Sequence, residues 1–224
     1  TSLPMMLLIT PDRVSEFIRS LLSTYKHDRY MPDARSGNCN GRTQGGSNAE
    51  ILIADAYLKG LDGVDWELAL QASLKDAEVP PGDTEEAEGR GGLREYNELG
   101  YIPYGIPRAG NRTVDYSYCD YAIYQLAEGL GHKDVAERFL KQSSNWKNLW
   151  RSDFIMPRDA DGNWLDVVKG LYPDHHEFEY TPVTNEAWKY SSNWDAFFYE
   201  GTSWQYSLGI PHDVPGLVNM CGGA

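Results

Sequence analysis

The sequence predicts an all-α fold in which paired helices form part of an α/α barrel. Apolar residues recur at helical spacing in one segment after another, and capping residues and glycines bound most of these segments. The connections differ greatly in length, whereas those of an up-and-down bundle are shorter and more equal. No fixed sequence period is present, which argues against a solenoid. A chain of 224 residues is long enough for a packed core.

The first predicted helix follows Thr10, a suitable N-cap, and has Pro11 in its first turn. Its apolar side chains fall on one face of the helix. They are Val14, Phe17, Ile18, Leu21, Leu22 and Tyr25. The stretch 30–46 is rich in Pro, Gly, Asn and Ser, so we expect a loop there. Because it is long for a plain connector, it is a candidate for a functional loop.

The second predicted helix, 51–59, follows a capping box formed by Ser47 and Glu50. Its residues are apolar nearly all round, a pattern typical of a buried helix. Gly60 supplies its C-terminal stop.

Asp65 begins the next predicted helix, and Pro80 ends it. The segment 82–92 is acidic and rich in glycine, so we expect it to be exposed. A short helix at 93–99 then ends at Gly100.

The second half of the sequence predicts three more helices and one turn. Two long helices are expected at 113–130, with Thr113 as the N-cap, and at 134–149. Asp161-Gly162 is a strong signal for a hairpin turn. An irregular aromatic segment, 172–199, precedes a final helix at 213–222.

Composition excludes two classes of partner. The formal net charge is −13 and no basic patch is present, so nucleic acid is not an expected partner. No apolar run is long enough to span a membrane, and the run 3–9 lacks the basic flank of a signal peptide. The acidic balance favours neutral or cationic ligands, or metal ions. Seven Trp and fifteen Tyr either fill the core or stack on sugar rings.

Glu200 is the best candidate for a catalytic acid. Tyr199, Trp204 and Tyr206 flank it, and we expect these rings to desolvate its carboxyl group in part. Desolvation raises the pKa of a carboxyl group, which a general acid needs to keep its proton near neutral pH. The alternative interpretation is that Glu200 is a carboxylate favoured by a helix N-terminus.

His212 and Asp213 form an adjacent pair of chemically capable residues. Neighbouring side chains diverge, so the pair is not expected to act as a catalytic dyad. Asp213 suits an N-cap, with Pro215 in the first turn of the helix. The role of His212 remains open.

Two further patterns have competing interpretations. Asp159, Asp161 and Asn163 place oxygen atoms at alternate positions, as calcium loops do, but the distal Glu of such a loop is missing and a hairpin is expected. Asn111 opens an Asn-Arg-Thr glycosylation sequon. We expect Thr113 to cap the following helix and Asn111 to lie just outside it, unmodified.

Taken together, several segments resemble glycoside hydrolase family 92, and they occur in the same order as in that family. They begin at Asp55 (Asp-Ala-Tyr-Leu-Lys-Gly), Gly100 (Gly-Tyr-Ile-Pro-Tyr), Arg112 (Arg-Thr-Val-Asp-Tyr-Ser-Tyr), Pro157 (Pro-Arg-Asp-Ala-Asp-Gly-Asn-Trp), Glu200 (Glu-Gly-Thr-Ser-Trp-Gln-Tyr) and Ile210 (Ile-Pro-His-Asp-Val-Pro-Gly-Leu). The segment from Thr43, Thr-Gln-Gly-Gly-Ser-Asn-Ala, is most similar to fungal members.

The resemblance implies an N-terminal β-sandwich, absent from this chain, followed by an (α/α)6 barrel of which residues 1–224 are a part. It implies release of terminal α-linked mannose, with α-1,2 linkages expected, by an inverting mechanism that uses a calcium ion. The glutamate matching Glu200 is the general acid, and Gln205 matches a region near the calcium site. Members are commonly secreted or periplasmic, so a secreted or extracytoplasmic location is expected.

The sequence also departs from the family pattern. The segments that carry the family's catalytic base and most calcium ligands, and its Trp-Asp-Thr substrate-binding stretch, are not found, and Cys119 replaces a usual acidic residue. We therefore expect mannose-containing glycans and the remainder of the enzyme, as another segment or chain, to be the partners. The alternative is a catalytically incomplete fragment that binds only a sugar or a protein.

Overall fold

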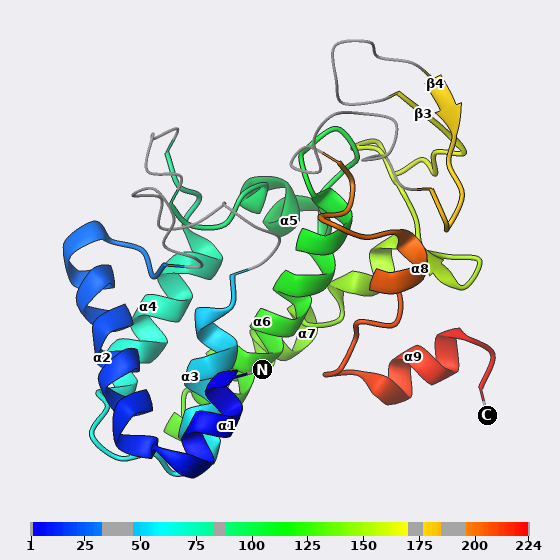
Figure 1. Cartoon of the computed structure of the whole chain (residues 1–224). Helices are drawn as coiled ribbons and strands as arrows, with labels where there is room; N and C mark the ends of the chain where they lie inside the picture. Colours follow the sequence, from blue (N-terminus) through cyan, green and yellow to red (C-terminus); the bar gives the residue numbers. More distant parts are fainter. Residues whose placement is uncertain (1, 33–46, 83–87, 170–176, 185–195, 224) are drawn as a thin grey trace. The chain divides into compact units, whose positions relative to one another are not determined.

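The computed structural model describes residues 2–32, 47–82, 88–169, 177–184 and 196–223 (Figure 1). The chain divides into two compact units, which are described separately below. The first comprises 1–93 and 119–143, and the second comprises 94–118 and 144–224. The prediction that 1–224 form part of one catalytic domain stays a prediction.

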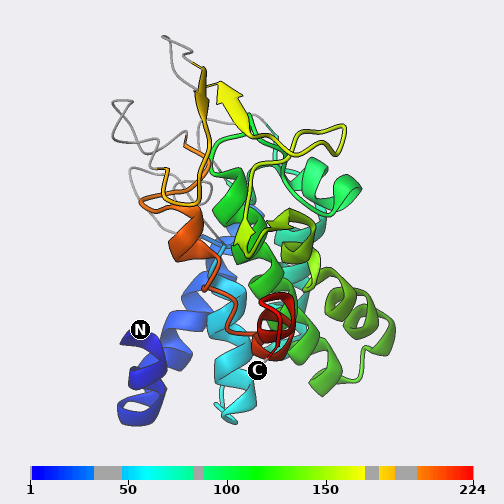
Figure 2. The same ribbon diagram turned by 90° about the vertical axis from the view of Figure 1, so that its right-hand side faces the viewer.

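The described residues are mainly helical, which confirms the predicted fold class. The helices are α1 (Ser2–Ile9), α2 (Pro11–Asp28), α3 (Ala49–Leu58), α4 (Trp66–Glu78), α5 (Leu93–Leu99), α6 (Ala109–Leu130), α7 (Lys133–Gln142), the 3₁₀ helix η1 (Asn145–Leu149), α8 (Ser203–Tyr206) and α9 (Val214–Met220). The strands are β1 (Trp150–Arg151), β2 (Phe154–Ile155), β3 (Val167–Lys169) and β4 (Glu177–Glu179). They pair as two short antiparallel ladders, β1 with β2 and β3 with β4, and the second is visible in both Figure 1 and Figure 2.

The core of the first unit contains the apolar faces of α2, α3, α4 and α7 with the C-terminal half of α6. On α2 the predicted face is largely confirmed, because Val14 and Ile18 are fully buried, but Phe17 is 45% exposed. Thr10 precedes this helix as predicted, yet its hydroxyl donates to the carbonyl of Met6 in α1 and does not cap it. The Asp65 cap of α4 is confirmed by a 3.0 Å bond from the Leu68 amide.

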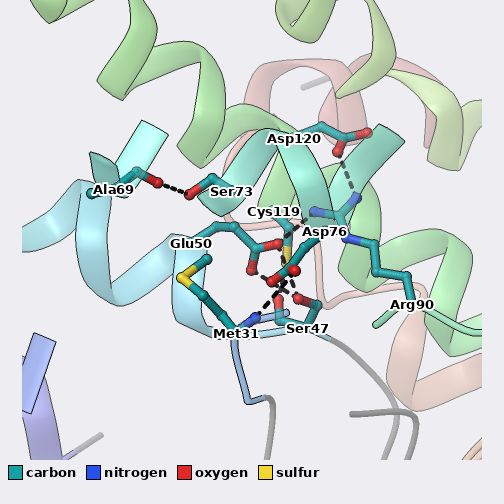
Figure 3. Close-up of polar contacts among 9 residues, drawn as sticks. All are labelled: Met31, Ser47, Glu50, Ala69, Ser73, Asp76, Arg90, Cys119 and Asp120. Carbon is teal, nitrogen blue, oxygen red and sulfur yellow. Dashed lines mark hydrogen bonds and ion pairs between the residues drawn. The ribbon is translucent and has the colours of Figure 1, made fainter. Parts of the chain in front are cut away.

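A buried ionic cluster in this unit was not predicted. The residues 89–91 were expected to be exposed with the rest of 82–92, but they are buried, and the side chain of Arg90 has no exposed surface. Its guanidinium lies 2.9 Å from carboxylate oxygens of both Glu50 and Asp120 (Figure 3). Burial of a charge requires such partners, so the ion pairs explain the location of this segment.

The same cluster overturns the predicted capping box of α3. The helix begins at Ala49, after Asn48, and the hydroxyl of Ser47 lies 2.9 and 3.0 Å from the two carboxylate oxygens of Glu50. Glu50 therefore binds the Ser47 hydroxyl and Arg90, because the buried guanidinium is a stronger partner than a backbone amide. Figure 3 shows both contacts.

Asp76 and Cys119 complete the cluster (Figure 3). The Asp76 carboxylate accepts a bond of 3.2 Å from the Met31 amide, and the Cys119 thiol donates to the Ser47 carbonyl. Burial, followed by the charge of Glu50, raises the pKa of Asp76 well above its ordinary value.

In the second unit, the predicted hairpin turn is confirmed. Arg158 and Trp164 form an antiparallel bridge, and Gly162 has a positive φ of 88°, a conformation that favours glycine. The Asp159 carboxylate accepts bonds of 2.7 and 3.1 Å from the backbone and side-chain nitrogens of Asn163. These oxygens therefore stabilise a turn.

Two helix boundaries in the sequence prediction are wrong. The segment 134–149 is divided into α7 and the 3₁₀ helix η1. Helix α6 begins at Ala109, one turn before Thr113. Thr113 is fully buried, and its hydroxyl donates to the Ala109 carbonyl (2.8 Å) and accepts from the Ile102 amide (3.0 Å). Thr113 therefore fixes the chain that precedes the helix, and it is not the N-cap.

Candidate active site around Glu200

The segment before Glu200 is attached to the N-terminal turn of α6. The amide of Arg108 donates to the carbonyl of Ala196 (2.7 Å), and the amide of Gly110 donates to that of Phe197 (2.9 Å). The first amides of a helix have no acceptor within the helix. The segment 196–199 supplies these acceptors, which explains why α6 begins earlier than its sequence predicts.

Gly110 permits the close approach of this segment. A Cβ atom at this position would lie 2.7 Å from ring carbons of both Phe197 and Phe198. Both rings are buried and pack edge to face, with centroids 4.8 Å apart. A larger residue would displace the aromatic pair that precedes Glu200.

Both polar groups of the Tyr199 backbone are bound by side chains. Its amide donates to Oδ1 of Asn111 (2.9 Å), and its carbonyl accepts from the hydroxyl of Tyr206 (2.7 Å). Nδ2 of Asn111 in turn donates to Oδ2 of Asp115 (3.3 Å), one helical turn along α6. Glu200 is the next residue after this fixed peptide.

Glu200 is an exposed residue, which argues against the predicted desolvation by its aromatic neighbours. Trp204 is itself 55% exposed and stacks on Phe154, with ring centroids 5.5 Å apart. The alternative, a carboxylate at a helix N-terminus, does not fit either, because α8 has Thr202 as its N-cap and Glu200 lies outside its first turn. Glu200 has a positive φ of 51°, in the left-handed region.

The two tyrosines beside Glu200 are held in the neutral form. Burial raises the pKa of Tyr199, and the charge of the Glu200 carboxylate and a hydrogen bond to it raise it further, against the opposing effect of Arg108. Burial raises the pKa of Tyr206 above the usual range, with contributions from the charges of Asp115 and Glu200. Both phenols therefore remain donors throughout the neutral range.

Gln205, the predicted calcium ligand, has a structural role in the described residues. Its Oε1 accepts from the amide of Thr202 (2.9 Å) and lies 3.3 Å from the Thr202 hydroxyl, which completes a capping box for α8. Within the described part of the chain, no group of three His, Cys, Asp or Glu residues could hold a metal ion. The calcium site and the ligand role of Gln205 stay predictions.

Asp213 is a helix N-cap, as predicted. The Asp213 carboxylate accepts from the Gly216 amide (2.9 Å) at the start of α9 and pairs with Lys147 at 2.7 Å. Burial opposes ionisation of Asp213, but the bonds from Lys147 and Gly216 outweigh it and lower its pKa. The imidazole of His212 instead stacks on Tyr118, with ring centroids 5.5 Å apart.

The contacts of Asn111 were not predicted from the sequence. It was expected outside the helix, but it lies in the first turn of α6 and is fully buried, with both ends of its amide bonded. The spacing of Asn111 and Asp115, four residues apart, is the one sequence signal of this arrangement. The absence of a glycan on Asn111 stays a prediction.

Comparisons with known proteins identify the relatives of this chain. The model of the glycosyl hydrolase family 92 catalytic domain matches residues 1–224. An uncharacterized secreted glycosidase of Arthroderma benhamiae is 39% identical over 227 residues, which cover 91% of this chain and 28% of that protein.

Two solved structures from Bacteroides thetaiotaomicron are also similar. A family GH92 inverting mannosidase has a TM-score of 0.80 and 29% identity over 95% of this chain and 26% of its own. A family GH92 α-mannosidase has a TM-score of 0.75 and 25% identity over the same shares. The chain thus spans little more than a quarter of the length of these relatives. Helices long and apolar enough to cross a membrane do not occur among the described residues.

Proposed function

Since the chain belongs to glycosyl hydrolase family 92, whose catalytic-domain model matches all 224 residues, we propose that it is part of an inverting α-mannosidase. In this proposal Glu200 is the general acid, and the substrates are glycans that end in α-linked mannose, with α-1,2 linkages preferred. The family membership and the mannosidases among its structural relatives support the reaction class.

The placement of Glu200 is the observation that carries the assignment. Glu200 is exposed, while Phe197 and Phe198, three and two residues before it, are buried. A substrate can therefore reach the carboxyl group, and the backbone that carries it is anchored to α6. A general acid requires both properties, because proton transfer needs a group held within hydrogen-bond reach of the glycosidic oxygen.

In the proposed reaction, Glu200 gives its proton to the glycosidic oxygen as the bond from that oxygen to C1 breaks. A water molecule attacks C1 from the opposite face and loses its proton to a second carboxylate. In inverting enzymes this base lies roughly 6.5–9.5 Å from the acid, which leaves room for the water. We propose that the base lies outside the described residues, in the remainder of a complete enzyme.

A bound calcium ion belongs to the same proposal. Calcium accepts six to eight oxygen ligands and would orient the hydroxyls of the sugar. The described residues contain no group of three or more His, Cys, Asp or Glu that could hold a metal ion, and in this proposal most of the ligands come from the same remainder, with Gln205 contributing one. The incomplete site also keeps the second interpretation open, in which these residues alone bind a sugar or a protein without catalysis.

We also propose that the complete protein is secreted. The fungal relative is named as a secreted glycosidase. A secreted location suits an enzyme that removes mannose from extracellular glycans.

The experiment uses the complete protein that contains these residues, with Glu200→Gln as the variant. Its activity is measured on two substrates. The first is α-1,2-mannobiose, whose mannose leaving group is poor and needs a proton, and the second is dinitrophenyl α-mannoside, whose leaving group needs none. We expect the first rate to fall by about 10²–10⁴-fold, the usual contribution of a general acid, and the second to fall far less. An equal fall on both substrates, or none, would contradict the role of Glu200.

A further inference from the structure

We propose that Asn111 and Tyr206 are positioning residues that aim the carboxyl group of Glu200, an inference that rests on the proposed function. They bind the two polar groups of the Tyr199 backbone, at 2.9 and 2.7 Å. Neither would touch the substrate in this role. The asparagine of the sequon would thus serve the acid and not a glycan.

The carbonyl held by Tyr206 belongs to the peptide that joins Tyr199 to Glu200. A peptide group is planar, so fixing its carbonyl also fixes the nitrogen and Cα of the next residue. With the amide on the other side of Tyr199 bound to Asn111, the backbone that enters Glu200 is held at two points. The remaining freedom lies in φ of Glu200 and in its side chain.

The conformation of Glu200 shows why such a restraint is needed. Its φ of 51° lies in the left-handed region, which is unfavourable for a residue other than glycine because Cβ comes too close to the following carbonyl oxygen. A residue in this region persists only where its surroundings determine the backbone. The two side-chain bonds to Tyr199 fix the peptide plane from which this φ is measured, and they would thereby help to keep the side chain of Glu200 on the exposed side.

The side chains of Tyr206 and Asn111 are themselves held in place. The ring of Tyr206 stacks on Phe198, with centroids 4.9 Å apart and planes 17° apart. A Cβ atom on Gly201 would lie 2.7 Å from a carbon of the same ring, so the residue after Glu200 leaves room for it. An ionised Asp115 can only accept hydrogen bonds, and it therefore selects the amide orientation of Asn111 that points Oδ1 at Tyr199.

The test measures the leaving-group ratio of variants of the complete protein. This ratio is kcat/KM on dinitrophenyl α-mannoside divided by kcat/KM on α-1,2-mannobiose. Tyr206→Phe keeps the stacked ring and removes only the hydroxyl, and Asn111→Ala removes the other contact. For each we expect the ratio to rise about 10- to 100-fold, because a misplacement of about 1 Å can cost 10²-fold. The loss should lie in kcat on mannobiose, with KM little changed.

Tyr101→Phe is the matched control. The Tyr101 hydroxyl donates to the Asp159 carbonyl at 2.7 Å, a bond of the same type and length that holds the hairpin at 158–164. Its loss should lower stability as much as Tyr206→Phe does and leave the leaving-group ratio unchanged. If Asn111→Ala does not fold, Tyr206→Phe decides the question with this control.

The outcomes separate the two proposals. A raised ratio in Tyr206→Phe and not in Tyr101→Phe supports the positioning role. An unchanged ratio in Tyr206→Phe, while Glu200→Gln raises it, overturns the positioning role and leaves the acid in place. An unchanged ratio in Glu200→Gln overturns the proposed acid and the positioning role with it.

Discussion

Nη2 of Arg90 lies 2.9 Å from Oε1 of Glu50, and neither side chain has any exposed surface. The other terminal nitrogen of the same guanidinium lies 2.9 Å from Asp120 (Figure 3). One positive group thus balances two buried carboxylates that come from α3 and α6. Removing Arg90 would leave both carboxylates without this cation, so we expect the loss of these contacts to destabilise the first unit.

We predict that Arg90→Met destabilises the first unit by about 3–5 kcal/mol, since breaking a buried ion pair leaves an uncompensated charge. Native-state hydrogen exchange of amides in α3 measures this change in the complete protein. Arg13→Met is the matched control, because the Arg13–Glu16 pair is exposed at 72% and 56%. It should change the opening free energy by less than about 0.5 kcal/mol. Equal effects of the two variants would refute the structural importance of the cluster.

Asp76 predicts a dependence of stability on pH. Its folded pKa is raised well above the ordinary 3.8, first by burial and then by the charge of Glu50. The folded state therefore binds more protons than the unfolded state above pH 3.8, and this stabilising contribution is lost as the pH rises through the folded pKa. Asp76→Asn keeps an acceptor for the Met31 amide and removes the ionisation.

Relative to the unmodified protein, we expect Asp76→Asn to gain stability steadily as the pH rises above about 4. Hydrogen exchange of the α4 amides at a series of pH values, corrected for the intrinsic exchange rate, measures this difference. A difference between the two proteins that does not vary with pH would show that Asp76 titrates normally.

Asn111 should carry no glycan, although its sequon is intact. The side chain is fully buried, and Oδ1 and Nδ2 are bonded to Tyr199 and Asp115. A glycan on Nδ2 would break one of these bonds and force the first turn of α6 open. Peptide mapping of the complete protein, produced in a glycosylating host, should show no label at Asn111 after enzymatic removal of N-glycans in heavy-oxygen water. A labelled peptide would contradict the arrangement of this site.

Asp213→Ala should weaken the start of α9 by about 1 kcal/mol, the usual effect of losing an N-cap. The pKa of Asp213 is lowered, despite its burial, by the bonds from Lys147 and Gly216. Its stabilising effect is therefore present above the ordinary pKa of aspartate and is lost as the pH falls through the lowered value. Exchange of the α9 amides should differ between variant and parent at neutral pH, and this difference should shrink in acid. A difference that persists in acid would mean that charge has no part in the cap.

The features that the sequence predicted well depend on neighbours along the chain. The Asp65 and Asp213 caps bind amides only three residues away, and the hairpin at Asp161-Gly162 depends on glycine at its turn. Such contacts form wherever the local residues allow them. The helical fold class follows from the same local periodicity.

The errors arise where a distant residue competes with a local pattern. Glu50 was predicted to cap a helix, but its carboxylate binds Arg90, 40 residues away. The segment 196–199 makes α6 begin at Ala109, one turn before Thr113, through contacts such as that of Asn111 with Tyr199, 88 residues apart. No pattern of neighbouring residues indicates these contacts, so they could not be predicted from the sequence.

The most direct test of the central claim is the anomer of mannose that the complete protein releases first. Proton NMR during hydrolysis of α-1,2-mannobiose distinguishes α- from β-mannose before mutarotation mixes them. Attack of water on the face opposite the leaving group inverts C1, so we predict that β-mannose appears first. Initial release of α-mannose, or no release of mannose at all, would contradict the assignment of this chain to an inverting α-mannosidase.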